Sequence, residues 1–347
     1  MTASWKHRFI AASKILILVI VLLAITGVVY EQIGKRQDRR KYPQIGQLVD
    51  IGGRKLNIFC SGNGSPTVVF DSGGHTAGYS WIDIQPEVAK VTRACWYDRA
   101  GYGWSDPGPS PRTFKAIATD LHDLLHAADI APPYVLVSAT AAGFHVRLYN
   151  HLYPDEVAGA LLVHPSDPDV LAHEPAYMKS ALASSPPIVQ KVGCKVLVPV
   201  MLQTGLLRLM GNPGSGWPYG IANLNPDQQK ELKFLSTNPE TAQTEGEGCV
   251  QDESMAEVRA AGNFGTRPLI ILTSSKPFRA PPGGQHVRAA DEANDYWFHQ
   301  MLPDLAGLST RGELVVEENA EQPDSIIRAV NRVVAEVRAE QAQATIR

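Results

Sequence analysis

From residue 48 onward, short apolar runs alternate with longer segments whose apolar residues recur every three or four positions. The inner short runs are almost continuously apolar, which is typical of parallel strands covered on both faces. The eight predicted strands cover residues 48–51, 55–60, 67–71, 94–98, 134–138, 158–163, 269–273 and 313–317. This alternation predicts an α/β chain with a doubly wound, mostly parallel, eight-stranded sheet.

Two helices can be predicted with a clear start. Thr113 is a residue type that caps a helix N-terminus, and the apolar residues after it follow a helical spacing. That stripe consists of Phe114, Ile117, Leu121, Leu124, Leu125 and Ala128. The final helix begins near Pro323, and its stripe consists of Ile326, Ile327, Val330, Val333, Val334 and Val337. Helices placed between and after the strands agree with a doubly wound sheet.

The N-terminus follows a different pattern. Residues 15–30 read ILILVIVLLAITGVVY and contain no charged side chain. A membrane-spanning helix needs about 20 apolar residues, and residues 9–13 extend this run if the Lys14 side chain reaches the membrane interface. We therefore expect one continuous helix from about Phe9 to Tyr30 that stands clear of the globular domain and anchors it in a membrane.

The charges around the apolar run leave the orientation of this anchor open. Three basic residues lie on its N-terminal side and five on its C-terminal side: Lys6, Arg8 and Lys14, then Lys35, Arg36, Arg39, Arg40 and Lys41. The larger number predicts a cytoplasmic domain, but a signal anchor with its domain outside also begins with basic residues. A cleaved signal peptide is the alternative, with a weak cleavage motif at residues 24–26. We favour an uncleaved, single-pass anchor.

One connection between strands is too long for an ordinary crossover. Residues 166–267 separate the sixth and seventh strands, and structureless loops of that length are uncommon. We interpret the segment as a mostly helical cap that covers the carboxyl edge of the sheet, where such folds bind ligands. The predicted organisation is a flank at 1–14, a transmembrane helix at 15–30, a linker at 31–47, a core at 48–165, a cap at 166–266 and a second core segment at 267–340.

Composition narrows the possible functions. The net charge of −3 gives no reason to expect a nucleic-acid partner. None of the four cysteines forms a CxxC pair, so zinc-site spacing is absent, and no metal or cofactor is predicted. Cys60 and Cys95 are expected as buried thiols in strands. Cys194 and Cys249 lie in the cap and could pair, which would require an oxidising compartment.

Three segments resemble those of the α/β-hydrolase family. Residues 97–106 (YDRAGYGWSD) resemble the YDRxGxGxSD segment after the fourth strand, and residues 151–159 (HLYPDEVAG) resemble the segment that leads into the sixth. Residues 71–75 (DSGGH) resemble the glycine-rich oxyanion loop after the third strand. The resemblance is strong over residues 48–165 and weak over 267–340. It implies an α/β-hydrolase fold and descent from serine hydrolases that act on esters, lipids or similar acyl compounds.

The resemblance places the nucleophile in a G-x-S-x-G turn after the fifth strand. Here Ser138 and Ala142 occupy the two glycine positions, and Thr140 occupies the nucleophile position. Threonine is an alcohol and some enzymes use it as a nucleophile, but a β-branched residue is costly in the strained backbone of this turn. We favour the interpretation that Thr140 only fills the former nucleophile site, since a threonine in such a turn usually caps or packs.

The acid and the base are also missing from their expected positions. The family places its histidine after the last strand, but residues 317–323 (EENAEQP) contain none, and Glu318 and Glu321 are interpreted as solvated loop residues. His164 stands where relatives carry the acid after the sixth strand. The other histidines nearby are given structural interpretations: His122 and His126 on a surface helix, His145 and His151 after the helix that follows the turn. Serine-hydrolase chemistry needs nucleophile, base and acid together, so we expect it to be lost.

Two functions stay open. One is a catalytically inactive protein that binds a small apolar or acyl ligand, or an unidentified protein partner, and contacts lipid through its N-terminal helix. The other is an atypical, esterase-like hydrolase that uses a Thr140–His164 dyad. Its oxyanion hole would be the backbone N–H groups of Gly74 or His75 and of Ala141. The missing catalytic residues favour the first.

Overall fold

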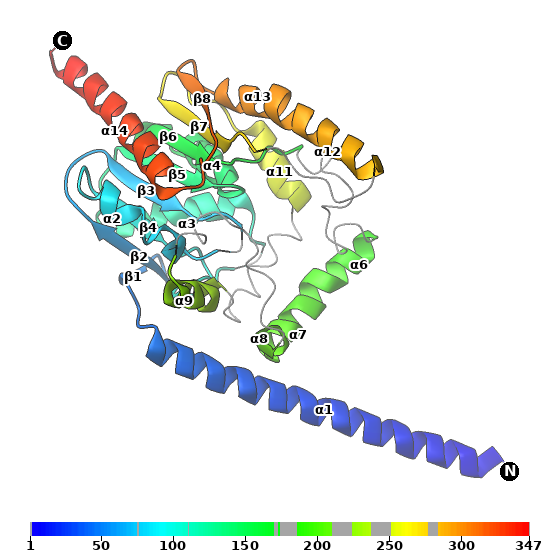
Figure 1. The fold of residues 1–347 in the computed structure, drawn as a ribbon. Helices are drawn as coiled ribbons and strands as arrows, with labels where there is room; N and C mark the ends of the chain where they lie inside the picture. The colour runs from blue at the N-terminus through cyan, green and yellow to red at the C-terminus, as the bar shows by residue number, and fades with distance from the viewer. Residues whose placement is uncertain are drawn as a thin grey trace.

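The protein's structure, a computed structural model, shows a single twisted sheet with helices on both faces and one long helix that leaves the domain (Figure 1). It describes residues 2–74, 76–109, 111–169, 173, 186–209, 224–236, 251–276 and 284–346.

The sheet has eight strands in the order β1-β2-β4-β3-β5-β6-β7-β8. They are β1 Gln47–Asp50, β2 Lys55–Ser61, β3 Thr67–Asp71, β4 Ala94–Tyr97, β5 Tyr134–Ala139, β6 Val157–Val163, β7 Leu269–Ser274 and β8 Gly312–Glu317. The β1–β2 and β2–β4 pairs are antiparallel, and the remaining neighbours run parallel. Every predicted strand is confirmed to within one residue at each end. The strands were readable because β3 to β7 are buried on both faces and are therefore almost entirely apolar.

The two faces of the sheet each carry an apolar layer. One layer packs α3 (Phe114–Ala127), α4 (Ala142–Leu152), α11 (Gln251–Ala260) and α13 (Leu302–Ala306) against the strands. The other packs α2 (Gln85–Val88) and α14 (Pro323–Ile346) against the opposite face. The remaining described elements are η1 Gly78–Trp81, η2 Pro154–Glu156, α6 Pro187–Val192, η3 Gly193–Leu197, α7 Val198–Gln203, α8 Leu206–Leu209, α9 Pro226–Ser236, α12 Gly284–Tyr296 and η6 Trp297–Met301.

The predicted start of α3 is confirmed. The hydroxyl of Thr113 accepts a hydrogen bond from the Ala116 N–H at 3.2 Å, so the side chain satisfies one of the unpaired donors of the first turn. The described parts of the 166–266 insertion are mainly helical, as expected. That this insertion forms a cap over Thr140 stays a prediction.

The N-terminal helix is longer than predicted. Helix α1 runs from Thr2 to Lys41, so the segment at 31–47 is mostly helix rather than a linker. Glu31 and Asp38 explain the difference, because both carboxylates accept hydrogen bonds from Arg208 of α8, at 2.8 and 2.6 Å. Those ion pairs hold two further turns of helix against the domain. The apolar part toward the N-terminus is not buried, as expected for a helix that stands clear.

The prediction that Cys60 and Cys95 are thiols is wrong. The two residues are register partners on the antiparallel strands β2 and β4, and a disulfide joins them. Partners in an antiparallel pair point to the same face with their Cβ atoms close together, which permits a disulfide. The sequence did not reveal this disulfide because β2 and β4 are far apart along the chain, and their pairing in the sheet could not be predicted from local patterns. Cys249 and the side chain of Cys194 lie outside the described parts of the chain, so their pairing stays untested.

Candidate active site at the strand-to-helix turn

The nucleophile position lies in the turn between β5 and α4, and Thr140 occupies it. Its backbone has a φ of 50°, the left-handed region that a β-branched residue rarely adopts. The Thr140 N–H donates to the carbonyl of Val163 at 2.9 Å, which fixes the turn to the end of β6. The residue is 9% exposed. The strained turn of the hydrolase pattern is therefore present, although its serine is not.

The turn also depends on a close backbone approach at Gly73, in the loop after β3. A Cβ added to Gly73 would lie 2.1 Å from the Thr140 Oγ1 and 2.3 Å from the carbonyl oxygen of Ala139. Only glycine leaves room for the Thr140 hydroxyl at this point. The glycine-rich loop and the turn therefore face each other, as the resemblance predicted.

Of the three residues predicted to supply oxyanion donors, the structure describes Gly74 and Ala141. Gly74 follows in the same loop with a φ of 51°, and its carbonyl accepts a hydrogen bond from Arg99. Ala141 is the N-cap of α4, directly after Thr140. His75 lies outside the described residues. Among the residues that are described, the Thr140 Oγ1 makes no hydrogen bond, so no base is seen to contact it. The role of these groups stays a prediction.

His164 lies at the end of β6, in the neighbouring position of the sheet. Its φ of 46° is also left-handed, and its N–H donates to the carbonyl of Leu272 at 2.8 Å. The Nδ1 lies 3.2 Å from the Oγ1 of Thr273 at the end of β7. Burial lowers the pKa of the imidazole to about 4, so the ring is neutral at neutral pH but a weak base.

The loop after β8 differs from the solvated loop that we expected. Glu318 is exposed, but the side chain of Glu321 is only 20% exposed and forms an ion pair with Lys276 at 3.4 Å. Its negative charge raises the pKa of His164, an effect smaller than that of burial. Glu321 lies in the loop after β8, where the family carries its histidine, and it is near enough to His164 for the two charges to interact.

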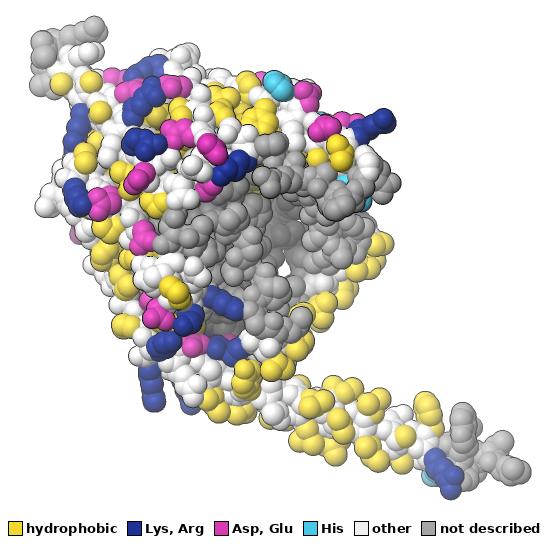
Figure 2. Space-filling view, viewed as in Figure 1, with side chains coloured by type: hydrophobic (Ala, Val, Ile, Leu, Met, Phe, Trp, Pro, Cys, Tyr) yellow, Lys and Arg dark blue, Asp and Glu magenta, His cyan; other side chains and the backbone are white. Residues whose placement is uncertain are grey.

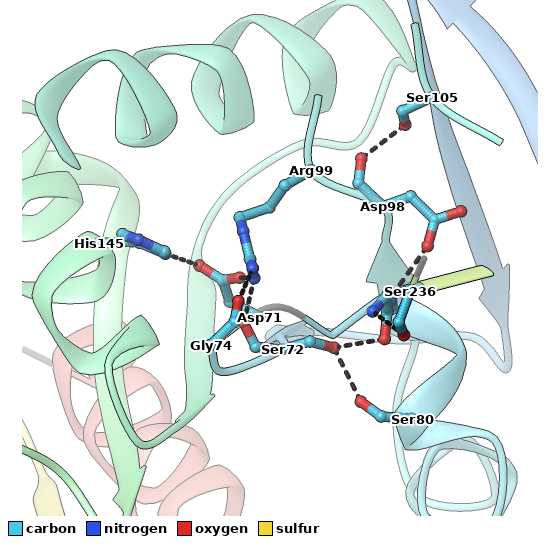
Figure 3. Close-up of polar contacts among 11 residues, drawn as sticks. Asp71, Ser72, Gly74, Ser80, Asp98, Arg99, Ser105, His145 and Ser236 are labelled. Atoms are coloured by element: carbon cyan, nitrogen blue, oxygen red, sulfur yellow. Dashed lines mark hydrogen bonds and ion pairs between the residues drawn. The ribbon is translucent and has the colours of Figure 1, made fainter. Parts of the chain in front are cut away.

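Sequence reasoning missed a buried ion network beside the turn (Figure 3). The Asp71 carboxylate at the end of β3 accepts from Arg99 at 3.2 Å and lies 2.8 Å from the Nδ1 of His145 on α4. Arg99 also donates to the carbonyls of Ser72 and Gly74. Burial alone would raise the pKa of Asp71, but His145 and Arg99 outweigh it and lower the pKa. The network fixes the shape of the glycine-rich loop.

The neighbouring motif residue Asp98 has a structural role as well. Its carboxylate accepts from the N–H groups of Gly78 and Trp104 at 2.8 and 3.1 Å, and from the side chain of Asn57 at 2.9 Å. Burial raises its pKa to about 6 despite these bonds. A Cβ on Gly103 would lie 2.2 Å from this carboxylate, which explains the glycine in the motif.

The sequence model of the alpha/beta hydrolase fold family matches residues 66–187, a range that contains β3 to β6 and the turn at Thr140. The chain has the α/β-hydrolase fold. This α/β-hydrolase-fold chain is similar in structure to a loop variant of the haloalkane dehalogenase DbeA from Bradyrhizobium elkanii, with a TM-score of 0.60 over 86% of this chain and 98% of the other. The two are 17% identical, so the likeness shows the fold alone.

Curated relatives align with part of the α/β-hydrolase-fold chain. The uncharacterised protein YbdG of Bacillus subtilis is 26% identical over 159 residues, which are 45% of this chain and 49% of YbdG. An uncharacterised vacuolar membrane protein of Saccharomyces cerevisiae is 33% identical over 102 residues, which are 28% of this chain and 16% of the yeast protein. The chain thus spans about half or less of the length of these relatives.

Proposed function

We propose that this α/β-hydrolase-fold protein is held at a membrane by α1, binds an apolar ligand or a partner at the carboxyl edge of its sheet, and lacks ordinary acyl-hydrolase activity. One observation carries the chemical part. Thr140 holds the nucleophile position, and its hydroxyl makes no hydrogen bond within the described part of the chain. A nucleophilic alcohol needs a base in hydrogen-bond contact to take its proton.

The basicity of His164 supports the same conclusion. With a pKa of about 4, the imidazole would bind a proton far more weakly than the histidine of a working serine hydrolase. Its Nδ1 lies at hydrogen-bond distance from Thr273, which ties one side of the ring to the end of β7. The proposal therefore treats His164 as a buried pocket group rather than a general base.

Helices α6, α7 and α8 support the membrane part of the proposal. Helices α7 and α8 contact α1, and α6 continues from them away from α1. Residues that are 41–73% exposed make the surface of this segment apolar: Ile188, Val189, Val192, Val196, Leu197, Val200, Leu206 and Leu209. Figure 2 shows this apolar surface next to the apolar surface of α1. Exposed apolar patches of this kind are typical of surfaces that contact membranes or partners. We propose that α6–α8 contacts the bilayer into which α1 inserts.

The Cys60–Cys95 disulfide favours one side of that membrane. Disulfides persist in oxidising compartments and are rare in the cytosol. We propose that the globular domain faces an oxidising compartment, against the count of flanking basic residues. The yeast relative is an uncharacterised vacuolar membrane protein, which supports the membrane assignment.

A second candidate, an atypical hydrolase that uses Thr140 with His164, has one observation in its favour. A threonine at a φ of 50° costs about 1–3 kcal/mol, and such strain is concentrated at functional sites. Glu321, whose charge acts on His164, would be the carboxylate that orients the imidazole. This candidate requires the imidazole to reach Thr140.

The test measures hydrolysis of short-chain aryl esters by the full chain in detergent. The parent, Thr140→Ser, Thr140→Ala and His164→Ala are compared, with Thr119→Ala on α3 as the matched control. We expect the parent and all variants to stay at or below about 10³–10⁴-fold over water, the level left when triad members are removed from a serine hydrolase. A fluorophosphonate should not label the parent.

Thr140→Ser should not restore activity, because no strong base is available to it. The opposite outcome is ready turnover by the parent and by Thr119→Ala that both Thr140→Ala and His164→Ala abolish. That result would establish the Thr140–His164 hydrolase and overturn the inactive assignment.

A further inference from the structure

We propose that His122, His126 and Glu156 form a binding site for a zinc ion. The two histidines are one turn apart on α3, so both side chains lie on the same side of the helix. Glu156 ends η2, just before β6. One ligand atom from each of the three residues lies within 4.8 Å of the others.

The distances are close to those of a zinc site. The Nδ1 of His122 lies 3.3 Å from one Glu156 oxygen, and the Nε2 of His126 lies 2.7 Å from the other. Ligand atoms on a tetrahedral zinc ion, at bonds of about 2.0–2.1 Å, are about 3.4 Å apart. The two distances go to different oxygens of Glu156, and both are below about 3.4 Å. To admit an ion between the three ligands, the His126 ring, which is 50% exposed, has to move outward.

Neighbouring groups hold the ligands in place. The Tyr149 hydroxyl donates to the Glu156 carboxylate at 2.5 Å, and the His122 ring stacks on Tyr153 with centroids 3.7 Å apart. Arg267 donates to the carbonyls of Pro154 and Val157, at 2.6 and 2.7 Å, which fixes the turn that carries Glu156. Groups that orient the ligands in this way typically raise metal affinity by 10–100-fold.

The charges at this point favour a cation. His126 lies in the last turn of α3, where the unpaired carbonyls of the helix carry partial negative charge. Burial would raise the pKa of Glu156, but Tyr149, His126 and His122 lower it overall, so the carboxylate is ionised at neutral pH. An ion pair would need only one histidine. Here two imidazoles, with ring centroids 4.3 Å apart, face one carboxylate.

The donor set indicates the type of metal. Two imidazole nitrogens and one carboxylate oxygen suit zinc, whereas calcium and magnesium prefer oxygen ligands. The exposure of His126 leaves a fourth position for water. The proposed zinc site lies near the N-terminal ends of β5 and β6, whereas Thr140 and His164 lie at their C-terminal ends. The length of β5 therefore separates the zinc site from the turn at Thr140 by about 20 Å. The ion would connect α3 to the start of β6 and would take no part in chemistry at Thr140.

The test uses the full chain in detergent, stripped with a chelator and then dialysed. Zinc is titrated by calorimetry, and cobalt(II) is added separately because a tetrahedral site with nitrogen ligands gives strong visible absorption. His126→Ala and Glu156→Gln remove a ligand each. The matched control is His299→Ala, because His299 also forms an exposed i,i+4 pair, with Asp295 at 3.0 Å.

We expect one zinc ion per parent chain and the same affinity in His299→Ala. Each ligand variant should lose more than about tenfold in affinity and the cobalt absorption as well. Circular dichroism checks that the variants fold, and agreement between the two ligand variants guards against a local folding defect in one. If the parent binds zinc no more tightly than His126→Ala and Glu156→Gln, the cluster is only an ion pair and the proposal is wrong.

Discussion

At the scale of single residues, the backbone conformation of the site is kept although the family's catalytic side chains are absent from it. Thr140 and His164 both have positive φ, and both N–H groups donate to a carbonyl on the next strand, Val163 and Leu272. Strained backbone persists only where the surrounding structure determines it. Strand ends and neighbouring carbonyls therefore shape this turn, and a serine is not required for it.

His164 leads to a prediction on pH. Its folded pKa of about 4 lies below the unfolded value of about 6.5, so the unfolded chain binds more protons between these values. The contribution of neutral His164 to the free energy of unfolding is complete above pH 6.5 and is lost as the pH falls toward 4. Asp98, with its pKa raised to about 6, changes stability in the opposite direction over part of this range.

A comparison with His164→Asn separates the two groups, because asparagine tolerates positive φ and does not titrate. Urea unfolding of the parent and the variant should be measured at pH 7 and pH 4.5. Relative to the variant, the parent should lose roughly 2–3 kcal/mol of unfolding free energy at the lower pH. An equal change in both proteins would show that His164 is not buried as a neutral imidazole.

At the scale of elements, the sequence predicted what local patterns determine. Strands β3 to β7 were found because burial on both faces makes them continuously apolar, and α3 because Thr113 and its stripe mark one helix. The family segments located the turn at Thr140. What escaped prediction depends on contacts between distant segments, such as the Arg208 ion pairs that extend α1 and the Asp71–His145 pair.

The disulfide between β2 and β4 gives a prediction at this scale. Cys60 and Cys95 are 35 residues apart, and closing a loop of that length stabilises the folded state by roughly 3–4 kcal/mol in the chain-entropy description. The double variant Cys60→Ser, Cys95→Ser should lose about that much in urea unfolding. Cys194→Ser, which leaves this pair intact, is the control.

Mass spectrometry after alkylation checks the bond itself. Under denaturing conditions without a reductant, Cys60 and Cys95 should stay unmodified, and both should react once a reductant is present. Their full alkylation in the protein purified without reductant would contradict the disulfide, and with it the assignment of the domain to an oxidising compartment.

At the scale of the whole molecule, two apolar surfaces, those of α1 and of the α6–α8 segment, meet where α7 and α8 contact α1. We predict that both contact lipid. Single cysteines that replace Leu22 in α1, Val196 in η3 and Val91 on the domain surface would carry an environment-sensitive fluorophore, in a chain with Cys194→Ser and Cys249→Ser. All three native side chains are exposed.

In lipid nanodiscs, spin-labelled lipids should quench the fluorophores at 22 and 196 and leave the one at 91 unchanged. Quenching at position 22 alone would show that α6–α8 does not contact the membrane, whereas α1 does. Quenching at neither position would show that α1 does not span the bilayer.

The contact between α1 and α8 determines how freely the domain can turn. Arg208 holds both Glu31 and Asp38, one face of α1 over two turns, while Gly27 and Gly34 on the same helix allow Thr204 and Arg208 to approach closely. A domain on a disordered tether would sample every heading above the bilayer. In the proposed arrangement, in which α1 spans a membrane, these ion pairs couple the helix axis to the domain, so a tilt of α1 would tilt the domain with it. The lipid thickness that sets the tilt would then also set the height of Thr140 above the headgroups.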